Sequence, residues 1–199
     1  MRRYQYWHPL INKKMEVKLL IRNVLYTQRL LLRKMKENDS HCLFTIWSNP
    51  DVTRFMNIEN FSNENQAKEM IHFLNELSAQ NKAMRYTIVE AKTNQIIGSC
   101  GFNTLDYENR KAEIGYELDS TFWGRGYGTE AVSSLVDYAF KQLHFTKIEA
   151  EVEPENLPSV KVLQKLHFSL EGTRRKSEES KGKSTDLHIY SRLQNESLL

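Results

Sequence analysis

The chain has 199 residues, of which 40% are hydrophobic and 27% are charged, and its formal net charge at pH 7 is +3. These values predict one globular domain with a sizeable core, and they exclude a strongly basic protein that would bind nucleic acid directly. No run of the sequence approaches the roughly 18 apolar residues that cross a bilayer, so we expect no membrane contact.

The N-terminal stretch is basic but has no uninterrupted apolar core, so it is not expected to be a signal peptide. We interpret residues 1–26 as an extension and residues 27–194 as the domain. Two cysteines, Cys42 and Cys100, are too few for a disulfide framework, which favours a reducing, cytoplasmic setting. The six histidines show no metal-ligand spacing with either cysteine, so we expect no metal site. We expect a monomer or a homodimer.

The first half of the domain combines a strand with two helices. Residues 28–35 have the pattern of a strand, and the segment ENDSHCLFTIWSNP has that of a short helix with capping residues at 38–40 and a stop at Asn49-Pro50. The segment SNENQAKEMIHFLNEL follows, with Ser62 or Asn63 as its cap and an apolar stripe at helical spacing. These two helices precede every other strand of the domain.

The period then changes to alternation in three runs, RYTIVEA, QIIGSCGF and KAEIGYEL, which short turns separate. Consecutive strands with short turns predict an antiparallel meander. A helix (TEAVSSLVDYAFKQL), a strand (KIEAEVE), a helix (LPSVKVLQKL) and two strand-like runs (FSLEGTRR and DLHIYSRL) complete the domain. The polar run KSEESKGKS between the last two predicts a solvated loop. His144 and His167 stand where the two helices end, and we interpret them as left-handed helix exits.

This order of elements predicts one mixed α/β domain with a partly antiparallel, twisted sheet and helices on both of its faces.

The segment FWGRGYGTEA, residues 122–131, places glycines at three alternate positions immediately before a helix. One interpretation is an ordinary turn, for which fewer glycines would suffice. Another is the dinucleotide fingerprint G-x-G-x-x-G/A, with Glu149 as the acidic residue about 20 positions further on. The third is a cradle in which free amides and a helix N-terminus bind a pyrophosphate. Because Glu113 and Glu117 alternate with apolar residues in the preceding strand, a doubly covered parallel strand is disfavoured, and with it the dinucleotide fold.

The runs AEIGYELDSTFWGRGYGTEA and IEAEVEPENLPSVKVLQKLHF resemble the GNAT superfamily of acetyl-CoA-dependent N-acetyltransferases. More narrowly, they resemble its RimJ/RimL branch, which acetylates the N-terminal amines of ribosomal proteins, and the similarity runs from about residue 28 to residue 193. The pyrophosphate motif of the superfamily is Q/R-x-x-G-x-G/A. Residues 123–128 fit it except at the first position, where Trp123 stands, as is common in the RimJ/RimL branch.

The resemblance implies a GNAT acyl-CoA acyltransferase fold with acetyl-CoA as co-substrate. It implies that the backbone around Leu118 and the side chain of Asn156 contact the pantetheine arm, while Ser159 lies near the sulfur. The pyrophosphate would be held at the loop of the motif, formed by Trp123, Arg125, Gly126, Tyr127, Gly128 and Thr129. Many members use a tyrosine further along the second helix as general acid, but Leu163 stands at that position here, so this role passes to Ser159.

Acetyl transfer needs a neutral amine, a polarised thioester carbonyl and a donor for the leaving sulfur. A protein α-amine has an ordinary pKa of about 7.7–8.0, against about 10.4 for lysine, so a carboxylate acting through a water suffices as base. A backbone N–H near residues 116–118 would polarise the carbonyl. The resemblance makes Glu151 the first candidate for the base and Glu113 the second. The other interpretation is that Glu149, Glu151 and Glu153 simply alternate along a solvated strand face.

The sequence leaves the acceptor open. By resemblance, its groove would lie between the two early helices and the C-terminal hairpin, near Trp47, Arg54 and Phe55. One hypothesis is an enzyme for a protein N-terminus, and another is an enzyme for a polyamine or an aminoglycoside-like amine, against which the net charge of +3 argues. A third hypothesis is a module that binds acyl-CoA without catalysis.

Overall fold

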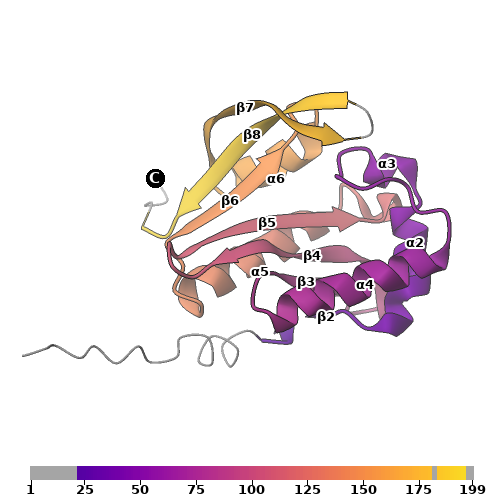
Figure 1. Cartoon of the computed structure of the whole chain (residues 1–199). Coiled ribbons are helices and arrows are strands. Elements are labelled where there is room, and N and C mark those ends of the chain that lie inside the picture. The colour runs from indigo at the N-terminus through magenta and orange to yellow at the C-terminus, as the bar shows by residue number, and fades with distance from the viewer. Residues whose placement is uncertain (1–21, 181–182, 196–199) are drawn as a thin grey trace, which may run out of the picture.

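The structure is a computed structural model that describes residues 22–180 and 183–195. Its strands are β1 (Val24–Tyr26), β2 (Leu30–Lys34), β3 (Met84–Glu90), β4 (Gln95–Asp106), β5 (Lys111–Leu118), β6 (Lys147–Val152), β7 (Ser169–Ser180) and β8 (Lys183–Leu193). In the described ranges they form one sheet of eight strands, in the order β1-β2-β3-β4-β5-β6-β8-β7 (Figure 1). Neighbours pair antiparallel except β5 and β6, which are parallel.

The helices in the described ranges are α2 (Ser40–Trp47), α3 (Pro50–Thr53), α4 (Glu64–Ala79), α5 (Tyr127–Lys141) and α6 (Leu157–Lys165), with two 3-10 turns, η1 (Glu37–Asp39) and η2 (Ser120–Phe122). Helices α2 and α4 cover one face of the sheet, and α5 and α6 cover the other (Figure 1). The predicted mixed α/β fold is therefore confirmed. None of the described helices is long and apolar enough to span a membrane.

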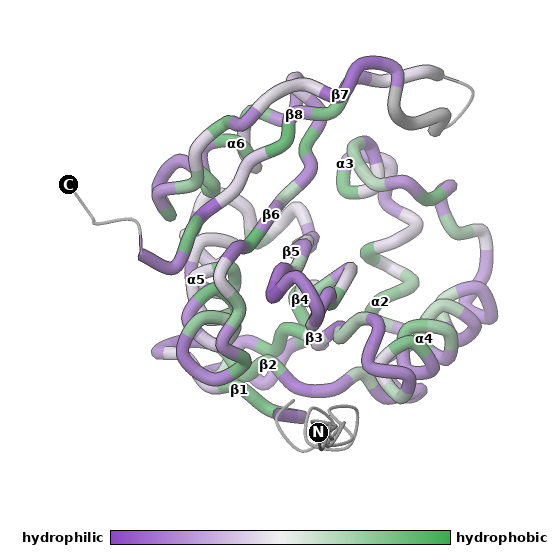
Figure 2. The backbone as a smooth tube through the Cα atoms, turned by 60° about the vertical axis from the view of Figure 1, so that its left-hand side comes forward, coloured by the Kyte–Doolittle hydropathy of each residue, from purple (hydrophilic) through white to green (hydrophobic). Residues whose placement is uncertain are grey.

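Each face of the sheet has its own apolar core. Helix α5 buries the stripe that the sequence predicted, which includes Val132, Leu135, Val136 and Ala139. Helices α2 and α4 form a second cluster with Leu43, Ile46, Trp47, Ala67 and Ile71. In Figure 2 the coil of α4 alternates between hydrophobic and hydrophilic segments, as expected of a helix with one face on a core and the other in solvent.

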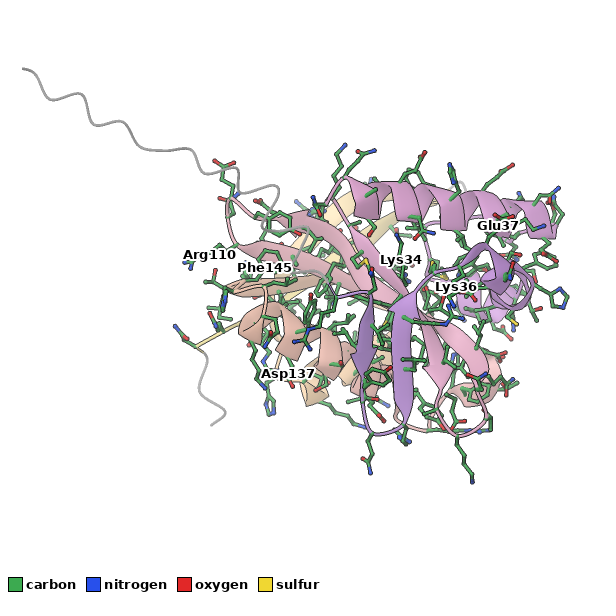
Figure 3. All side chains as sticks on the ribbon, turned by 90° about the horizontal axis from the view of Figure 1, so that it is seen from below. Lys34, Lys36, Glu37, Arg110, Asp137 and Phe145 are labelled. Atoms are coloured by element: carbon green, nitrogen blue, oxygen red, sulfur yellow. The ribbon has the colours of Figure 1, made fainter. Side chains whose placement is uncertain are left out.

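Strands β5 and β6 are held together at one end and separate at the other. Their parallel register extends only from Lys111↔Lys147 to Glu113↔Glu149. Just before these pairs, the Thr146 amide donates to the Arg110 carbonyl at 2.7 Å, and Arg110 and Phe145 lie at the same end of the molecule in Figure 3. Beyond Glu113 the two strands are not paired, so the sheet opens between them.

The two histidines at the helix exits have the predicted left-handed backbone. The φ angles are 55° at His144 and 59° at His167. Histidine tolerates this region better than β-branched residues do. The interpretation of both as helix exits is confirmed.

The predicted solvated loop over residues 176–184 is wrong for most of its length. Strand β7 continues to Ser180 and β8 begins at Lys183, and their register includes Glu178↔Thr185 and Ser180↔Lys183. The partner strand supplies the hydrogen bonds that fix this segment, so a polar sequence without apolar alternation is extended all the same. Figures 1 and 2 both show the far ends of β7 and β8 on the side of the molecule where α3 lies, which is the expected rim of the acceptor groove.

Two further elements carry weak signals in the sequence. Strand β1 lies within residues 24–26, which the sequence assigned to the extension; it pairs with β2 and buries Leu25. At Asn49-Pro50 the chain ends α2 as predicted and then starts α3, because the Asn49 side chain accepts from the Asp51 amide at 3.0 Å and proline suits the first helical position.

Candidate active site

A cavity of about 360 Å³ lies where β5 and β6 separate. It is lined from both faces of the sheet. Tyr116, Val132, Asn156, Ser159 and Leu163 line it from the α5 and α6 side, and Trp47, Phe55, Met56, Arg85, Glu113, Glu117 and Glu151 line it from the α2 and α4 side. The predicted residues Glu113, Glu151, Asn156 and Ser159 thus meet in one cavity, whereas the glycine loop follows the end of β5 beside it.

The glycine loop uses a backbone that only glycine adopts readily. Gly124 and Gly126 have φ angles of 72° and 81°, and Gly126 is the N-cap of α5 with no side chain to satisfy the first amides. The Glu130 amide is the first in this turn with a helical acceptor, the Gly126 carbonyl at 3.0 Å. The amides before it have no intrahelical partner and point out of the positive end of the helix.

Gly128 is required for a different reason. A Cβ atom there would lie 2.8 Å from Cε2 of Tyr116. The ring of Tyr116 therefore packs directly on the first turn of α5. The alternate glycines thus serve two purposes, the first two for the turn of the chain and the third for close packing against β5.

A side-chain hydrogen bond from Trp123 connects the loop to the end of β5. Its indole Nε1 donates to the Leu118 carbonyl at 2.9 Å, while the residue stays 48% exposed. The Asp119 amide donates to Ile97 on the β4 side at 2.9 Å, so the alternation of the strand turns the amide and carbonyl of Leu118 towards the cavity side. The carbonyl of Leu118 is thus taken by Trp123, and its amide remains for another acceptor.

Glu130 anchors the first turn of α5 to the turn between β1 and β2. Its carboxylate accepts from the Thr27 hydroxyl at 2.6 Å, the Arg29 amide at 2.7 Å and the Arg29 Nε at 2.6 Å. The same guanidinium donates to the Arg125 carbonyl at 2.9 Å. Burial raises the pKa of Glu130, but the hydrogen bonds from Thr27 and Arg29 outweigh it, so the pKa lies below its ordinary value.

Replacing this carboxylate, Glu130→Gln, should lower the free energy of unfolding at pH 7 by about 1–2 kcal/mol. Because the folded pKa lies below the unfolded one, the contribution of the carboxylate is complete at neutral pH and is lost as the pH falls through the folded pKa. Urea unfolding of both proteins at pH 7 and at about pH 3 should therefore show the difference shrinking in acid. Asp137→Asn is the control, since Asp137 lies on the same helix in an exposed pair with Lys141 (Figure 3) and should change stability by less than about 0.5 kcal/mol at either pH.

On the other side of the cavity, α6 begins with an asparagine cap that leaves a serine hydroxyl available. The Asn156 side chain accepts from the Ser159 amide at 3.2 Å, so the helix cap is Asn156 and the Ser159 hydroxyl is not needed for it. The Ser159 hydroxyl lies 3.4 Å from that of Tyr116. Leu163, one turn later, is buried and lines the same cavity.

Glu117 is a buried carboxylate with several donors. It accepts from the Trp47 indole at 3.0 Å, from the Ser99 hydroxyl and from the Arg85 guanidinium. Arg85 also donates to Ser99 at 2.8 Å and to Asn103 at 3.1 Å. The side chains of Glu117 and Arg85 are only 4% and 13% exposed. This network holds the α2 side of the cavity rigid, and its carboxylate is fully engaged.

The two candidate bases have different partners. Glu113 accepts from the neutral donors Asn103 and Thr104 at 2.9 and 3.1 Å. Glu151 forms an ion pair with Arg174 of β7 at 2.8 Å, and 56% of that arginine side chain is exposed. An exposed pair of this kind contributes little, so an incoming cation can replace the guanidinium.

Glu149 lies at the closed end of the cleft and is paired with Lys111 and Lys147, both at 2.9 Å. Burial raises its pKa, but the two lysines lower it further, to below the ordinary value. This carboxylate is therefore structural, and the alternating glutamates of β6 do not share one environment.

Comparison with known proteins is clear about the family. Residues 29–169 match the acetyltransferase (GNAT) domain. The chain belongs to the GNAT family of N-acetyltransferases. Within this family, the N-acetyltransferase p20 of Bacillus licheniformis, described as uncharacterized, is 47% identical over 172 residues, which cover 86% of this chain and 97% of p20.

Solved structures share the fold of this GNAT protein. RimL, described as a ribosomal L7/L12 alpha-N-protein acetyltransferase in complex with coenzyme A, has a TM-score of 0.79 at 21% identity and covers 85% of this chain and 97% of its own. MccE, described as a microcin C7 self immunity acetyltransferase in complex with acetyl-CoA and AMP, has a TM-score of 0.78 at 24% identity and covers 84% and 93%. The family match and the relatives described as N-acetyltransferases make this protein an N-acetyltransferase, as the first hypothesis from the sequence expected.

Two features of this GNAT site were not found from the sequence. Tyr116 shares the inward face of β5 with Ile114, and an aromatic residue in an alternating strand is expected in the core. Glu117 was recognised only as a charged residue in that alternation, because its donors come from α2, β3 and β4, whose juxtaposition no spacing reveals. Trp47 was expected in the core or at the acceptor; it is buried, donates to Glu117 and lines the cavity.

Proposed function

We propose that this protein transfers the acetyl group of acetyl-CoA to the N-terminal amine of a protein, such as a ribosomal protein, in a ternary complex. The observation that carries the proposal is the cavity between β5 and β6, which has carboxylates on one side of the sheet and, on the other, the Ser159 hydroxyl in the first turn of α6. Two substrates entering from opposite faces would meet at the opening of the sheet.

The loop suits the pyrophosphate of the co-substrate. The unpaired amides from Arg125 to Thr129 and the positive end of α5 favour an anion, the Thr129 hydroxyl would assist, and the left-handed glycines remove side chains from its path. Arg125 is exposed and stands over the ring of Phe122 at 5.3 Å, close enough to the loop to add an ionic contact. The amide of Leu118 and the side chain of Asn156 would contact the pantetheine arm.

For the chemistry, Glu151 would accept the amine proton through a water, and Glu113 is the second candidate. Arg174 would be displaced from Glu151 by the acceptor ammonium. An amide of β5 near Tyr116 or Leu118 would polarise the thioester carbonyl as the C–N bond forms. When the C–S bond breaks, both electrons stay on sulfur, and Ser159 would donate a hydrogen bond to it. In the overall reaction an amine and a thioester give an amide and a thiol.

The choice of a protein α-amine rests on two points. Its low pKa suits a base acting through water, and the structurally similar RimL is described as an alpha-N-protein acetyltransferase. The apolar residues Phe55, Met56 and Ile58 beside the carboxylates would suit the first side chain of a peptide. A small-molecule acceptor is the second candidate, because MccE, of equal fold similarity, is not described as acting on a protein. Both cysteines are free, which agrees with the cytoplasmic setting we propose.

The test is thiol release from acetyl-CoA with a panel of acceptors: peptides with free N-termini taken from ribosomal proteins, the same peptides blocked at the N-terminus but containing lysine, polyamines and aminoglycosides. We expect turnover with the free N-terminal peptides and mass spectra with one added acetyl group on the α-amine. Turnover confined to the small amines would transfer the assignment to the second candidate. Turnover of the blocked peptides would show that lysine is the acceptor.

A further inference from the structure

We infer that Tyr116 is a positioning residue for the leaving sulfur: its phenol donates to the Ser159 hydroxyl and thereby directs the hydroxyl hydrogen of Ser159 into the cavity. The inference rests on the proposed function, since it concerns the thiol of the same co-substrate. The observation behind it is that Tyr116 on β5 and Ser159 in the first turn of α6 both line the cavity, and their hydroxyl oxygens lie 3.4 Å apart.

The position of the phenol is fixed by packing. The ring lies against Gly128, where a Cβ would come within 2.8 Å of it, so the first turn of α5 holds the ring against the sheet. The Ser159 main chain is fixed as well, because its amide donates to the Asn156 cap at 3.2 Å. The freedom left to this pair is rotation of the Ser159 side chain about its Cα–Cβ bond and rotation of the two hydroxyl hydrogens. A distance of 3.4 Å is long for O–H···O, and such contacts shorten when a site is occupied.

We assign the phenol as the donor, because a phenol is more acidic than an alkyl hydroxyl and is therefore the stronger hydrogen-bond donor of the two. Burial raises the pKa of Tyr116, so the phenol remains protonated and has a hydrogen to donate. A hydroxyl oxygen that accepts from the phenol directs its own hydrogen elsewhere. The cavity is the direction in which a reacting group would lie.

The step balances without any proton leaving either hydroxyl. As the C–S bond breaks, sulfur keeps both electrons and leaves as a thiolate that accepts a hydrogen bond from Ser159. The amine proton goes to the base, and the thiolate takes its proton from solvent. Tyr116 and Ser159 therefore lower the energy of the thiolate by hydrogen bonding alone, and Leu163 leaves the α6 side of the cavity without a phenol of its own.

The test measures the pKa of bound coenzyme A, which needs no acceptor. Coenzyme A labelled at the carbon beside sulfur is titrated by NMR when bound to wild type, Tyr116→Phe, Ser159→Ala and the double variant. We expect the thiol pKa to rise by about one unit in Ser159→Ala and by about half a unit in Tyr116→Phe. The double variant should equal Ser159→Ala, because Tyr116 acts only through the serine. Glu113, Glu117, Glu151 and Arg85 line the same cavity in all four proteins and cancel in the differences.

Tyr107→Phe is the matched control. The Tyr107 hydroxyl is also buried, has no hydrogen-bond partner in the described part of the chain, and does not line the cavity. This variant should leave the pKa of the bound thiol unchanged. If Tyr116→Phe raises the thiol pKa equally in the presence and in the absence of Ser159, the effect is one of packing and the inference is overturned. The inference is also overturned if Tyr116→Phe does not raise the thiol pKa. If wild type does not bind coenzyme A at all, the proposed function fails, which is a separate result.

Discussion

Glu151→Gln should lower the turnover number with an N-terminal peptide about 100-fold at neutral pH, with the KM for acetyl-CoA unchanged. Glutamine keeps the size of the side chain and one of its two acceptor oxygens, but it cannot accept the amine proton. Glu151 lines the cavity on the proposed acceptor side, and its partner Arg174 is exposed enough to be displaced. Steady-state rates of thiol release measure the effect.

The dependence on pH gives this prediction a second readout. The α-amine has an ordinary pKa of about 7.7–8.0, so above that range it arrives already neutral and needs less help from a base. The loss of turnover in Glu151→Gln should therefore shrink as the pH rises to about 9, which is roughly one unit above the pKa range of the amine. A loss of binding or folding would not recover in this way.

Glu149→Gln is the matched control, because Glu149 is the preceding glutamate on the same face of β6 but is held by Lys111 and Lys147 at the closed end of the cleft. It should change the turnover number by less than about twofold. If Glu151→Gln behaves like this control and Glu113→Gln loses activity, the base is Glu113. Within the described part of the chain its oxygens are bound by the neutral donors Asn103 and Thr104 alone, so it needs no cation to leave.

The parts of the fold that the sequence predicted are those with local signals. The stripe of α5 and the meander of β3 to β5 have clear periods, and both histidine helix exits follow from a left-handed turn after a helix. The hairpin after Gly172 was expected to contain a loop because its residues are polar. Its strands extend through pairing with each other, which is a property of two segments and not of either one.

The candidate site likewise has features that local sequence signals predict and features that only the folded chain reveals. The glycine loop could be predicted because positive φ angles at Gly124 and Gly126 restrict the residue type within a few positions. The opening between β5 and β6 could not be located from periodicity, since it depends on where parallel pairing stops, after Glu113↔Glu149. The partners of Glu117 come from three other elements, so its role could be read only from the folded chain.

Among the side chains near the site, Glu117 is expected to contribute most to the free energy of unfolding. Glu117→Gln should lower the free energy of unfolding by about 3–5 kcal/mol, because it leaves the Arg85 guanidinium buried without its carboxylate. In a chain of this size the melting temperature should fall by about 10 °C. Urea unfolding should show a lower midpoint with an unchanged slope.

Removing both charges tests the reason for this loss. In Glu117→Gln combined with Arg85→Met, no buried cation remains without a counter-charge, so part of the lost stability should return. Glu149→Gln again supplies the comparison, since its ion pairs with Lys111 and Lys147 are more exposed and should contribute about 1 kcal/mol or less. If Glu117→Gln costs no more than that, the Arg85 guanidinium must find water or another acceptor once the carboxylate is gone. The wall of the cavity would then owe its order to the apolar packing of Trp47 and not to the buried charge.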